Sequence, residues 1–172
     1  MRTAVLMNLA LNQRLLQGAP LAPADTRALL RSARALAQVP AAAPQPLQGK
    51  QIALYAVGPD PDAADEFDAA ASQLGARVSR LQPDAALQRV GLARGDDALR
   101  VLARLYDAVA FNALDPVAAL RLQDILGLPV FCGALDRNHP VQQLRAAFGD
   151  PEGSPATRRC LLQAWLLEAM LR

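Results

Sequence analysis

The feature that most constrains the fold is the alternation of short apolar runs with helix-like segments through the middle of the chain. The segments predicted as strands are 51–57, 77–81, 107–111 and 128–132, and the apolar run at 51–57 is typical of a buried strand. The segments with helical periodicity between them are 67–74, 97–105 and 116–126. Strands that alternate with helices in this way pair in parallel, and the helices cover both faces of the sheet. The pattern therefore predicts an α/β fold, a three-layer αβα sandwich around a central, mainly parallel sheet of about four strands.

Helices outside the alternation complete the expected architecture. Pro23 and Asp25 suit the first turn of a helix, and an Ala/Pro-rich connector follows at 39–46. Ser154 and Pro155 predict the start of a long apolar helix that continues to the end of the chain. A face this apolar must be buried, and we expect it to pack on the same domain, with contact to another subunit as the alternative.

The expected organisation is one domain spanning 1–172. It would comprise N-terminal helices and the connector at 1–45, an αβ core at 46–148 and the C-terminal helix at 154–172. A chain of 172 residues can bury about two thirds of its unfolded surface, which is enough for one core. Met1 together with a full terminal helix favours a complete product.

Composition excludes several classes of function. The net charge is +2 and aromatic residues make up 4% of the chain, so we expect no nucleic-acid partner. No apolar segment is long enough to span a membrane, and Asn8 and Asn12 interrupt the apolar N-terminus, which predicts a cytoplasmic protein. Cys132 and Cys160 lack metal-type spacing and the chain has a single histidine, so we expect reduced thiols, no metal and no cofactor.

The loop after the first strand stands where α/β folds commonly bind anions. A strand–loop–helix turn aims backbone N–H groups and a helix N-terminus at one point. Here that loop carries Pro59, Asp60 and Asp62, and further acids follow between 65 and 68. The acids would suit a cation or a basic ligand in place of phosphate; capping of the following helix together with solvation is the better-supported alternative.

Five segments occur in the order and the near-constant spacing of one enzyme family: 23–30, 46–50, 70–75, 97–108 and 136–142. In turn they resemble the family's leucine-rich first helix, its Leu-x-Gly-Lys lead into the first strand, its Ala-Ala-x-Gln-Leu-Gly helix end, its Asp-Thr-x-Arg-Val-Leu-Ser-Arg helix and its His-Pro-Thr/Cys-Gln signature. From about residue 14 to about residue 144 the chain is similar to the carbamoyl-phosphate-binding domain of aspartate and ornithine carbamoyltransferases, especially the ornithine branch.

The resemblance implies a phosphate pocket in which several positions have changed. The family's Ser-Thr-Arg-Thr-Arg loop corresponds to 60–64, which reads Asp-Pro-Asp-Ala-Ala and lacks both arginines. Asn112 stands where the family has an arginine, and Val141 replaces the Thr or Cys of the His-Pro signature. The candidate ligand-binding residues are Pro59, Asp60, Asp62, Asn112, His139, Pro140 and Gln142, with no residue assigned as catalytic.

His139 has two interpretations. The resemblance implies that it donates a hydrogen bond to a carbonyl oxygen of a substrate. A structural histidine whose ring bonds to nearby backbone is the favoured alternative, because the anion clamp around it is missing.

These departures, and the lack of the family's amino-acid-binding domain, predict a catalytically inactive carbamoyltransferase-like protein with an assembly or regulatory role. An active chain would be a carbamoyltransferase-type transferase. One alternative is a subunit that completes a shared active site with a carbamoyltransferase partner; another is a repurposed binder of a small basic metabolite. Because the family's first domain forms a trimer interface, the resemblance implies a homo-oligomer, and specifically a trimer.

Overall fold

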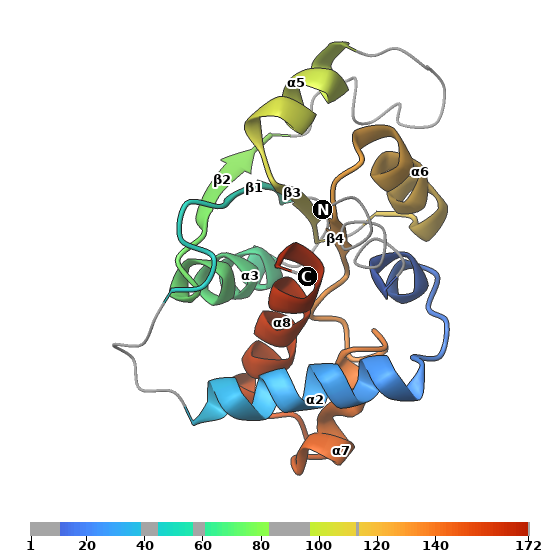
Figure 1. Cartoon of the computed structure of the whole chain (residues 1–172), viewed down its shortest axis with the longest axis vertical. Helices are drawn as coiled ribbons and strands as arrows, with labels where there is room; N and C mark the ends of the chain where they lie inside the picture. The colour runs from blue at the N-terminus through green and yellow to red at the C-terminus, as the bar shows by residue number, and fades with distance from the viewer. Residues whose placement is uncertain (1–10, 39–44, 57–60, 83–96, 113, 172) are drawn as a thin grey trace.

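A parallel sheet lies at the centre of the fold. The computed structural model describes residues 11–38, 45–56, 61–82, 97–112 and 114–171. The strands are β1 (Gln51–Tyr55), β2 (Arg77–Leu81), β3 (Ala108–Phe111) and β4 (Val130–Cys132). They form one four-stranded sheet in the order β2-β1-β3-β4, and every neighbouring pair is parallel (Figure 1). The predicted α/β class and the parallel sheet of four strands are confirmed.

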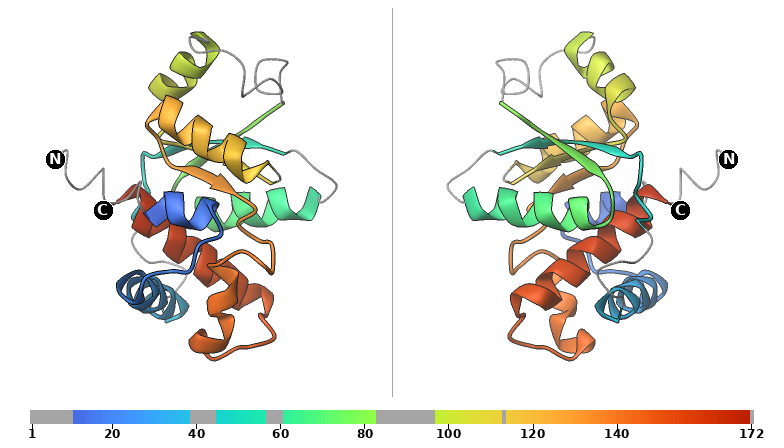
Figure 2. Two further views of the ribbon diagram at one scale, coloured as in Figure 1. Left: turned by 90° about the vertical axis from the view of Figure 1, so that its right-hand side faces the viewer. Right: turned by 90° about the vertical axis from the view of Figure 1, so that its left-hand side faces the viewer.

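Helices cover both faces of this sheet (Figure 2). They are α2 (Pro23–Ala37), α3 (Pro61–Gln73), α5 (Asp97–Leu105), α6 (Pro116–Leu126), α7 (Arg145–Phe148), α8 (Pro155–Met170) and the 3-10 turn η1 (Gln142–Leu144). Residues 11–16 are also helical. In the side views α5 and α6 lie on one face of the sheet and α3 and α8 on the other, which gives the expected three layers.

The side chains of β1 alternate between two cores, as the period of a strand requires. Ile52 and Leu54 belong to the core that contains residues of α3 and α8. Ala53 and Tyr55 belong to the core on the α5–α6 face, where the rings of Tyr55 and Phe111 stack with their centroids 5.1 Å apart. A strand that buries both of its faces needs apolar residues throughout, which explains the continuous apolar run in the sequence.

The start of α3 differs from the sequence prediction. The helix begins at Pro61, well before the predicted start at 67. Proline is tolerated in the first turn, and Asp62 lies in that turn, where a negative charge interacts favourably with the helix dipole. The acids that made this segment look like a loop are residues that favour a helix N-terminus.

A buried amide joins the helical residues 11–16 to the sheet. Asn12 is fully buried, and its Nδ2 donates hydrogen bonds to Gln123 Oε1 at 2.5 Å and to the carbonyl oxygen of Val130 at 2.7 Å. Its Oδ1 accepts a bond from Trp165 Nε1 at 2.8 Å. Asn12 therefore links α6, β4 and α8 at one point, and its buried polar atoms are satisfied.

The C-terminal helix α8 is buried between the sheet and α2. Ser154 caps it by accepting a hydrogen bond from the backbone of Thr157, and Pro155 occupies the first turn. Trp165 packs edge-on against Phe131 of the sheet with ring centroids 4.9 Å apart. The buried residues of α8 also include Gln163 and Glu168, so the apolar character expected for this helix is not confirmed.

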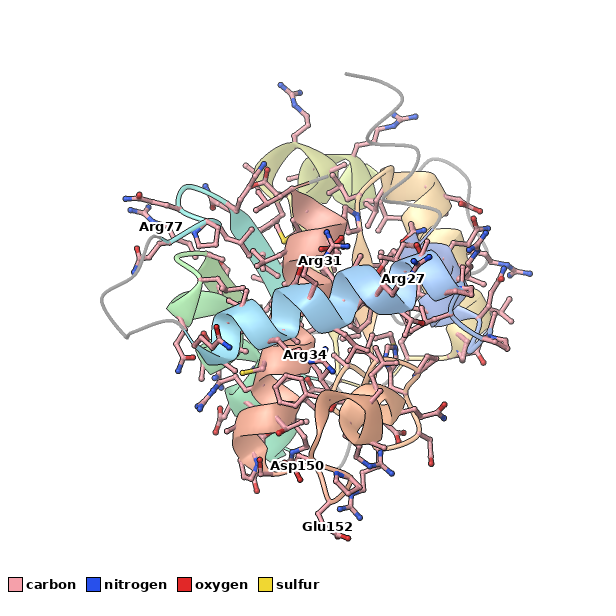
Figure 3. The ribbon with its side chains drawn as sticks, turned by 60° about the horizontal axis from the view of Figure 1, so that its bottom comes forward. Arg27, Arg31, Arg34, Arg77, Asp150 and Glu152 are labelled. Carbon is pink, nitrogen blue, oxygen red and sulfur yellow. The ribbon has the colours of Figure 1, made fainter. Side chains whose placement is uncertain are left out.

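The outer face of α2 is basic. Leu29 and Ala33 are buried, whereas Arg27, Arg31 and Arg34 are exposed along the opposite side of the helix (Figure 3). Within the described part of the chain, no helix combines the length and the apolar character needed to cross a bilayer.

Candidate functional site

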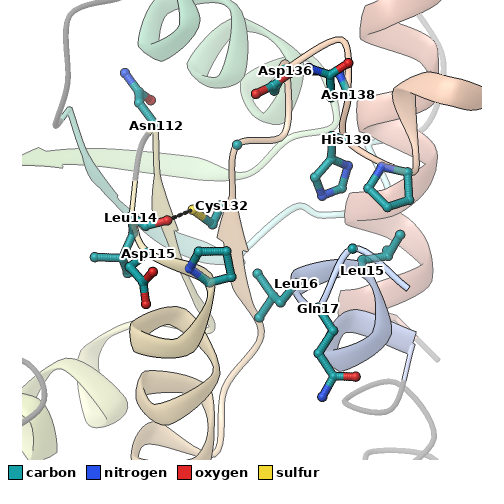
Figure 4. Close-up of a pocket in the computed structure, with 14 residues that line it drawn as sticks. Leu15, Leu16, Gln17, Asn112, Leu114, Asp115, Cys132, Asp136, Asn138 and His139 are labelled. Atoms are coloured by element: carbon teal, nitrogen blue, oxygen red, sulfur yellow. Dashed lines mark hydrogen bonds between the residues drawn. The ribbon is translucent and has the colours of Figure 1, made fainter. Parts of the chain in front are cut away.

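A cavity of about 630 Å³ lies where β3 and β4 end, the edge of a parallel sheet at which ligands commonly bind (Figure 4). Its walls come from the end of the helical segment 11–16, the turn between β3 and α6, and the loop that follows β4. The lining residues are Leu15, Leu16, Gln17, Gly18, Asn112, Leu114, Asp115, Pro116, Cys132, Gly133, Asp136, Asn138, His139 and Pro140.

The charged groups of this lining are all carboxylates. Asp115 is the N-cap of α6, and its Oδ1 accepts hydrogen bonds from the backbone N–H groups of Val117 and Ala118. The Oδ1 atom of Asp136 accepts from the backbone of Asn138 at 2.8 Å. Neither lysine nor arginine occurs among the described residues that line the cavity.

His139 is held in one tautomer by its own loop. The Nδ1 atom accepts a hydrogen bond from the backbone N–H of Val141 at 3.3 Å, so the ring proton is assigned to Nε2. The residue as a whole is 9% exposed, and its ring stacks on that of Trp165 with centroids 4.5 Å apart. Burial lowers the pKa of His139 from 6.5 to about 4, although the charge of Asp136 acts in the opposite direction. The ring is therefore neutral at pH 7.

The other ring nitrogen has no partner in the described residues: Nε2 is buried and makes no hydrogen bond there. In Figure 4 the imidazole projects from the loop towards Leu15 and Leu16 on the other side of the cavity. A buried N–H group without an acceptor costs about 1–3 kcal/mol, so Nε2 is an unsatisfied donor beside the cavity.

Cys132 lies on the cavity wall at the end of β4. Its Sγ donates to the carbonyl oxygen of Leu114 at 3.2 Å, the contact drawn as a dashed line in Figure 4. Burial raises the pKa of this thiol above its usual value, so the group is protonated at neutral pH. A protonated thiol is a poor nucleophile, and the geometry gives Cys132 a packing role.

The structure brings together three of the residues proposed from the sequence. Asn112, His139 and Pro140 all line the cavity, although they come from different parts of the chain. Gln142 does not line it. Its Nε2 donates to the carbonyl oxygens of Ala134 at 2.9 Å and Arg158 at 3.3 Å, so this side chain ties the loop to α8.

The acidic segment of α3 is used for ion pairs within the chain. Asp65 and Asp68 both bind Arg80 of β2, at 2.6 and 2.9 Å, and their hydrogen bonds raise the pKa of its guanidinium. Glu66 binds Arg158 of α8 at 2.9 Å. The expected solvation is not contradicted, since 65% of the Asp65 side chain and 40% of the Glu66 side chain stay exposed, and the arginine pairs are additional to it.

Of the loop candidates Pro59, Asp60 and Asp62, the structure describes Asp62 alone. Asp62 is exposed in the first turn of α3 and is not part of the lining. Pro59 and Asp60 lie outside the described residues. Among those that are described, no group of three or more His, Cys, Asp or Glu side chains is placed to hold a metal ion.

Sequence reasoning missed Asp115 as a site residue. The signal was available, since Asp115 immediately precedes Pro116, an arrangement typical of an N-cap followed by the first turn. That cap also follows a predicted strand, which places its carboxylate at the end of the sheet where ligands bind. Leu15 and Leu16 could not have been assigned, because nothing local shows where that helix packs.

No protein-family model matches the chain. It is 34% identical over 101 residues to the ornithine carbamoyltransferase of Haemophilus influenzae (strain PittGG), a match that covers 58% of this chain and 30% of that protein. The ornithine carbamoyltransferase of Cutibacterium acnes is 33% identical over 102 residues, with 59% and 30% covered. The match thus spans under a third of the length of these curated relatives.

Solved structures show the same fold. The anabolic ornithine carbamoyltransferase of Campylobacter jejuni has a TM-score of 0.56 at 22% identity, over 74% of this chain and 41% of that one. The ornithine carbamoyltransferase of Burkholderia thailandensis also has a TM-score of 0.56, at 20% identity, over 72% and 43%. The resemblance inferred from the motifs is confirmed: the chain is carbamoyltransferase-like and corresponds in sequence and fold to part of an ornithine carbamoyltransferase.

Proposed function

We propose that this protein is a catalytically inactive carbamoyltransferase-like domain with an assembly or regulatory role. The observation that carries the proposal is the charge of the cavity at the ends of β3 and β4. Its described lining contains the carboxylates of Asp115 and Asp136, a neutral His139 and no cationic side chain. Carbamoyl phosphate, the ligand that the resemblance implies, is an anion, and this lining disfavours it.

The expected binding free energies support the loss of anion binding. A charge-assisted hydrogen bond contributes roughly 1.5–3 kcal/mol, and the changes at 60–64 and at Asn112 remove three arginines of the family pattern. A dissociation constant in the micromolar range needs about 8 kcal/mol in total. The carboxylates of Asp115 and Asp136 would also repel a bound phosphate, by about 1 kcal/mol or more for each close charge pair.

The arginines near α3 do not compensate for this loss. Arg80 is bound to Asp65 and Asp68, and Arg158 is bound to Glu66. An incoming anion would have to compete with carboxylates that are already in place. The ion pairs instead connect α3 to β2 and α8, which supports a structural role for these charges.

The short length of the sequence match supports a role other than catalysis. The matched region covers 30% of the curated relatives, and the motifs that carry the resemblance are those of the family's carbamoyl-phosphate-binding domain. We assign the chain to a single domain over 1–172 that acts through assembly in the cytoplasm. The resemblance implies that this domain self-associates as a trimer.

Isothermal titration calorimetry with carbamoyl phosphate and with a phosphonoacetyl amino acid tests the proposal. We expect no saturable heat at millimolar ligand from protein shown to be folded by circular dichroism. Sub-millimolar binding of both ligands, with each displacing the other, would overturn the proposal.

Light scattering on the same sample gives the oligomeric state. A homo-oligomer is expected, and a monomer would contradict the self-association in the proposal. Co-purification with an intact carbamoyltransferase whose turnover then changes would favour the shared-site alternative over independent assembly.

A further inference from the structure

The inference concerns the outer face of α2. It names a surface and a kind of partner for the assembly role in the proposed function, and it rests on the proposed function in that respect. Two rows of side chains run along this face of the helix. The arginine row consists of Arg27, Arg31 and Arg34, and the alanine row consists of Ala24, Ala28 and Ala35.

The arginine row lies on one side of the helix. Its members are four and three residues apart, so they fall within about 60° of the helix circumference and span about 10 Å along the axis. All three are exposed and lie along α2 in Figure 3, whereas Leu29 and Ala33 on the opposite side are buried. The spacing therefore gives a continuous line of positive charge.

No carboxylate among the described residues binds the arginine row. Arg27 donates to the carbonyl oxygen of Pro23 at 3.1 Å, and Arg34 donates to that of Ala147 at 2.8 Å. Arg31 has no hydrogen-bond partner in the described part of the chain. The carbonyl contacts hold two guanidinium groups in place and leave their charge uncompensated, so the row keeps donors for the carboxylates of a partner.

The positive charge of the chain is concentrated in this helix. α2 contains three arginines and one acid, Asp25, which gives a net charge of +2, equal to that of the whole chain. Asp25 is itself bound by Arg14 at 3.2 Å. Like charges four residues apart on a helix repel one another, so a negatively charged partner would stabilise this arrangement.

The alanine row bears on the shape of the partner. Ala24 and Ala35 are exposed and Ala28 is half-buried, and all three lie beside the arginine row on the helix surface. Side chains this small let a second helix approach to about 8 Å between axes, the short end of the range for packed helices. Carboxylates at i, i+4 and i+7 of such a helix repeat the arginine spacing, whereas alternate residues of a strand are about 7 Å apart.

Other anionic partners fit this face less well. The exposed large apolar residues of the described chain lie on α5, on α6 and after α8, so α2 lacks side chains that would insert into a bilayer. Glu152 is exposed below α2 in Figure 3, where a membrane or a nucleic-acid duplex spread over the face would meet its carboxylate. The acidic helix α3 of a second copy is already engaged, because its carboxylates bind Arg80 and Arg158 of their own chain.

We propose that the outer face of α2 docks an acidic amphipathic helix of a partner protein. Three carboxylates at i, i+4 and i+7 of that helix bind the arginine row, and its small or apolar residues pack on the alanine row. The partner is a chain of different sequence, recognised by its negative charge and by the helical spacing of that charge.

Fluorescence anisotropy with two labelled peptides tests the charge and its spacing. Both are hydrocarbon-stapled, alanine-rich helices of about 18 residues. In the probe three glutamates stand at i, i+4 and i+7, and in the control peptide the same three are distributed around the helix. We expect saturable binding of the probe, at least about tenfold weaker binding of the control peptide, and weaker binding of the probe as salt is raised.

Charge-removing variants locate the site. The arginine-row variant, Arg27→Gln with Arg31→Gln and Arg34→Gln, should weaken the probe at least about tenfold. The matched control removes the same charge from exposed positions on α5, α6 and α8, and should change binding by less than about twofold. Its substitutions are Arg104→Gln, Arg121→Gln and Arg159→Gln.

A further variant tests the alanine row. Ala24→Gln with Ala35→Gln keeps every arginine and uses a good helix former at two exposed positions, so the fold and the charge are retained. The longer side chains prevent close approach of a second helix and should weaken the probe several-fold. Unchanged binding would contradict packing on the alanine row and overturn the helical docking.

The remaining outcomes also decide the inference. Equal binding of the two peptides, equal effects of the two arginine triples, or no binding of the probe would each overturn it. Tighter binding to phosphatidylserine vesicles or to duplex DNA than to the probe, lost in the arginine-row variant, would assign the face to a lipid or a nucleic acid and overturn it.

Two controls separate this inference from the proposed function. Light scattering should give the same oligomeric state for the arginine-row variant and the native protein, and a change would make the face an interface between copies and overturn the inference. Saturable binding of carbamoyl phosphate in calorimetry would contradict the proposed function, whereas loss of peptide binding alone would contradict only the docking of the helix.

Discussion

The two ring nitrogens of His139 lie in different surroundings, and the residue has features of both interpretations derived from the sequence. Nδ1 accepts from the backbone of Val141, as expected of a structural histidine. Nε2 is buried without a partner in the described residues of a cavity wall, as expected of a binding residue. The same burial that positions the ring keeps it neutral.

The low pKa of His139 predicts acid sensitivity. The folded-state pKa is about 4 and the ordinary value is 6.5, so the unfolded chain binds the extra proton first as the pH falls. Stability from this residue is complete above pH 6.5 and is lost between pH 6.5 and about 4, by about 3 kcal/mol at most. Urea unfolding at pH 7 and pH 4.5 measures the loss.

His139→Gln is the matched variant for this prediction, because it removes the titration and retains a polar side chain. Its stability should change less between those two pH values than that of the native protein. An equal change in both proteins would show that His139 is not responsible. Asp150, whose pKa is lowered by a hydrogen bond from Ser154, adds acid sensitivity only below its ordinary value of 3.8.

Asn12 offers a second test with a nearby control. Asn12→Ala leaves the Trp165 indole N–H and a buried carbonyl oxygen without their partner, and should cost about 2–4 kcal/mol of unfolding free energy. Arg14→Ala in the same helical segment removes an exposed ion pair with Asp25 and should cost less than about 1 kcal/mol. Similar losses in chemical denaturation would contradict the central role of the buried amide.

The sequence predicted the C-terminal ends of two helices more clearly than their starts. Gly75 and Gly127 directly follow the predicted helices 67–74 and 116–126, and both have left-handed backbone angles, with φ of 90° and 64°. Their surroundings differ. A Cβ on Gly75 would lie 2.5 Å from the Cβ of Gln45, whereas a Cβ on Gly127 would meet nothing within 4 Å.

This difference predicts unequal effects of the same substitution. Gly127→Ala carries only the strain of a left-handed alanine, about 1–2 kcal/mol. Gly75→Ala adds the overlap with Gln45 and should cost roughly twice as much. Thermal unfolding of both variants measures the difference, and equal losses would show that the segment at Gln45 moves aside without cost.

At the scale of the whole molecule, α8 joins layers that are far apart in the sequence. Trp165 contacts Phe131 of the sheet, stacks on His139 of the cavity wall and donates to Asn12. It is the single tryptophan of the chain and is fully buried. Its fluorescence therefore reports on the point at which the cavity loop, the sheet and the N-terminal helical segment meet.

The proposal of a single domain over 1–172 predicts one cooperative transition. Tryptophan fluorescence and far-ultraviolet circular dichroism should give the same urea midpoint, because loss of α8 exposes the core on its face of the sheet. Separate midpoints would mean that α8 and its contacts unfold independently of the sheet, and would contradict the single domain.

The sequence by itself determined the alternating architecture. Continuous apolar runs favour strands buried on both faces, as in β1 and β3, and Gly75 and Gly127 follow directly on predicted helices. These signals are local, since propensity, periodicity and backbone geometry act over a few neighbouring residues.

Only the tertiary structure decided how the charged and polar residues are used. Arg80 binds Asp65 and Asp68, Gln142 ties a loop to α8, and Asp115 joins His139 at one cavity. The partners lie far apart in the chain or in different elements, so no local pattern specifies them. Long polar side chains bond to whatever packing brings within about 3 Å, and that proximity exists only once the layers have assembled.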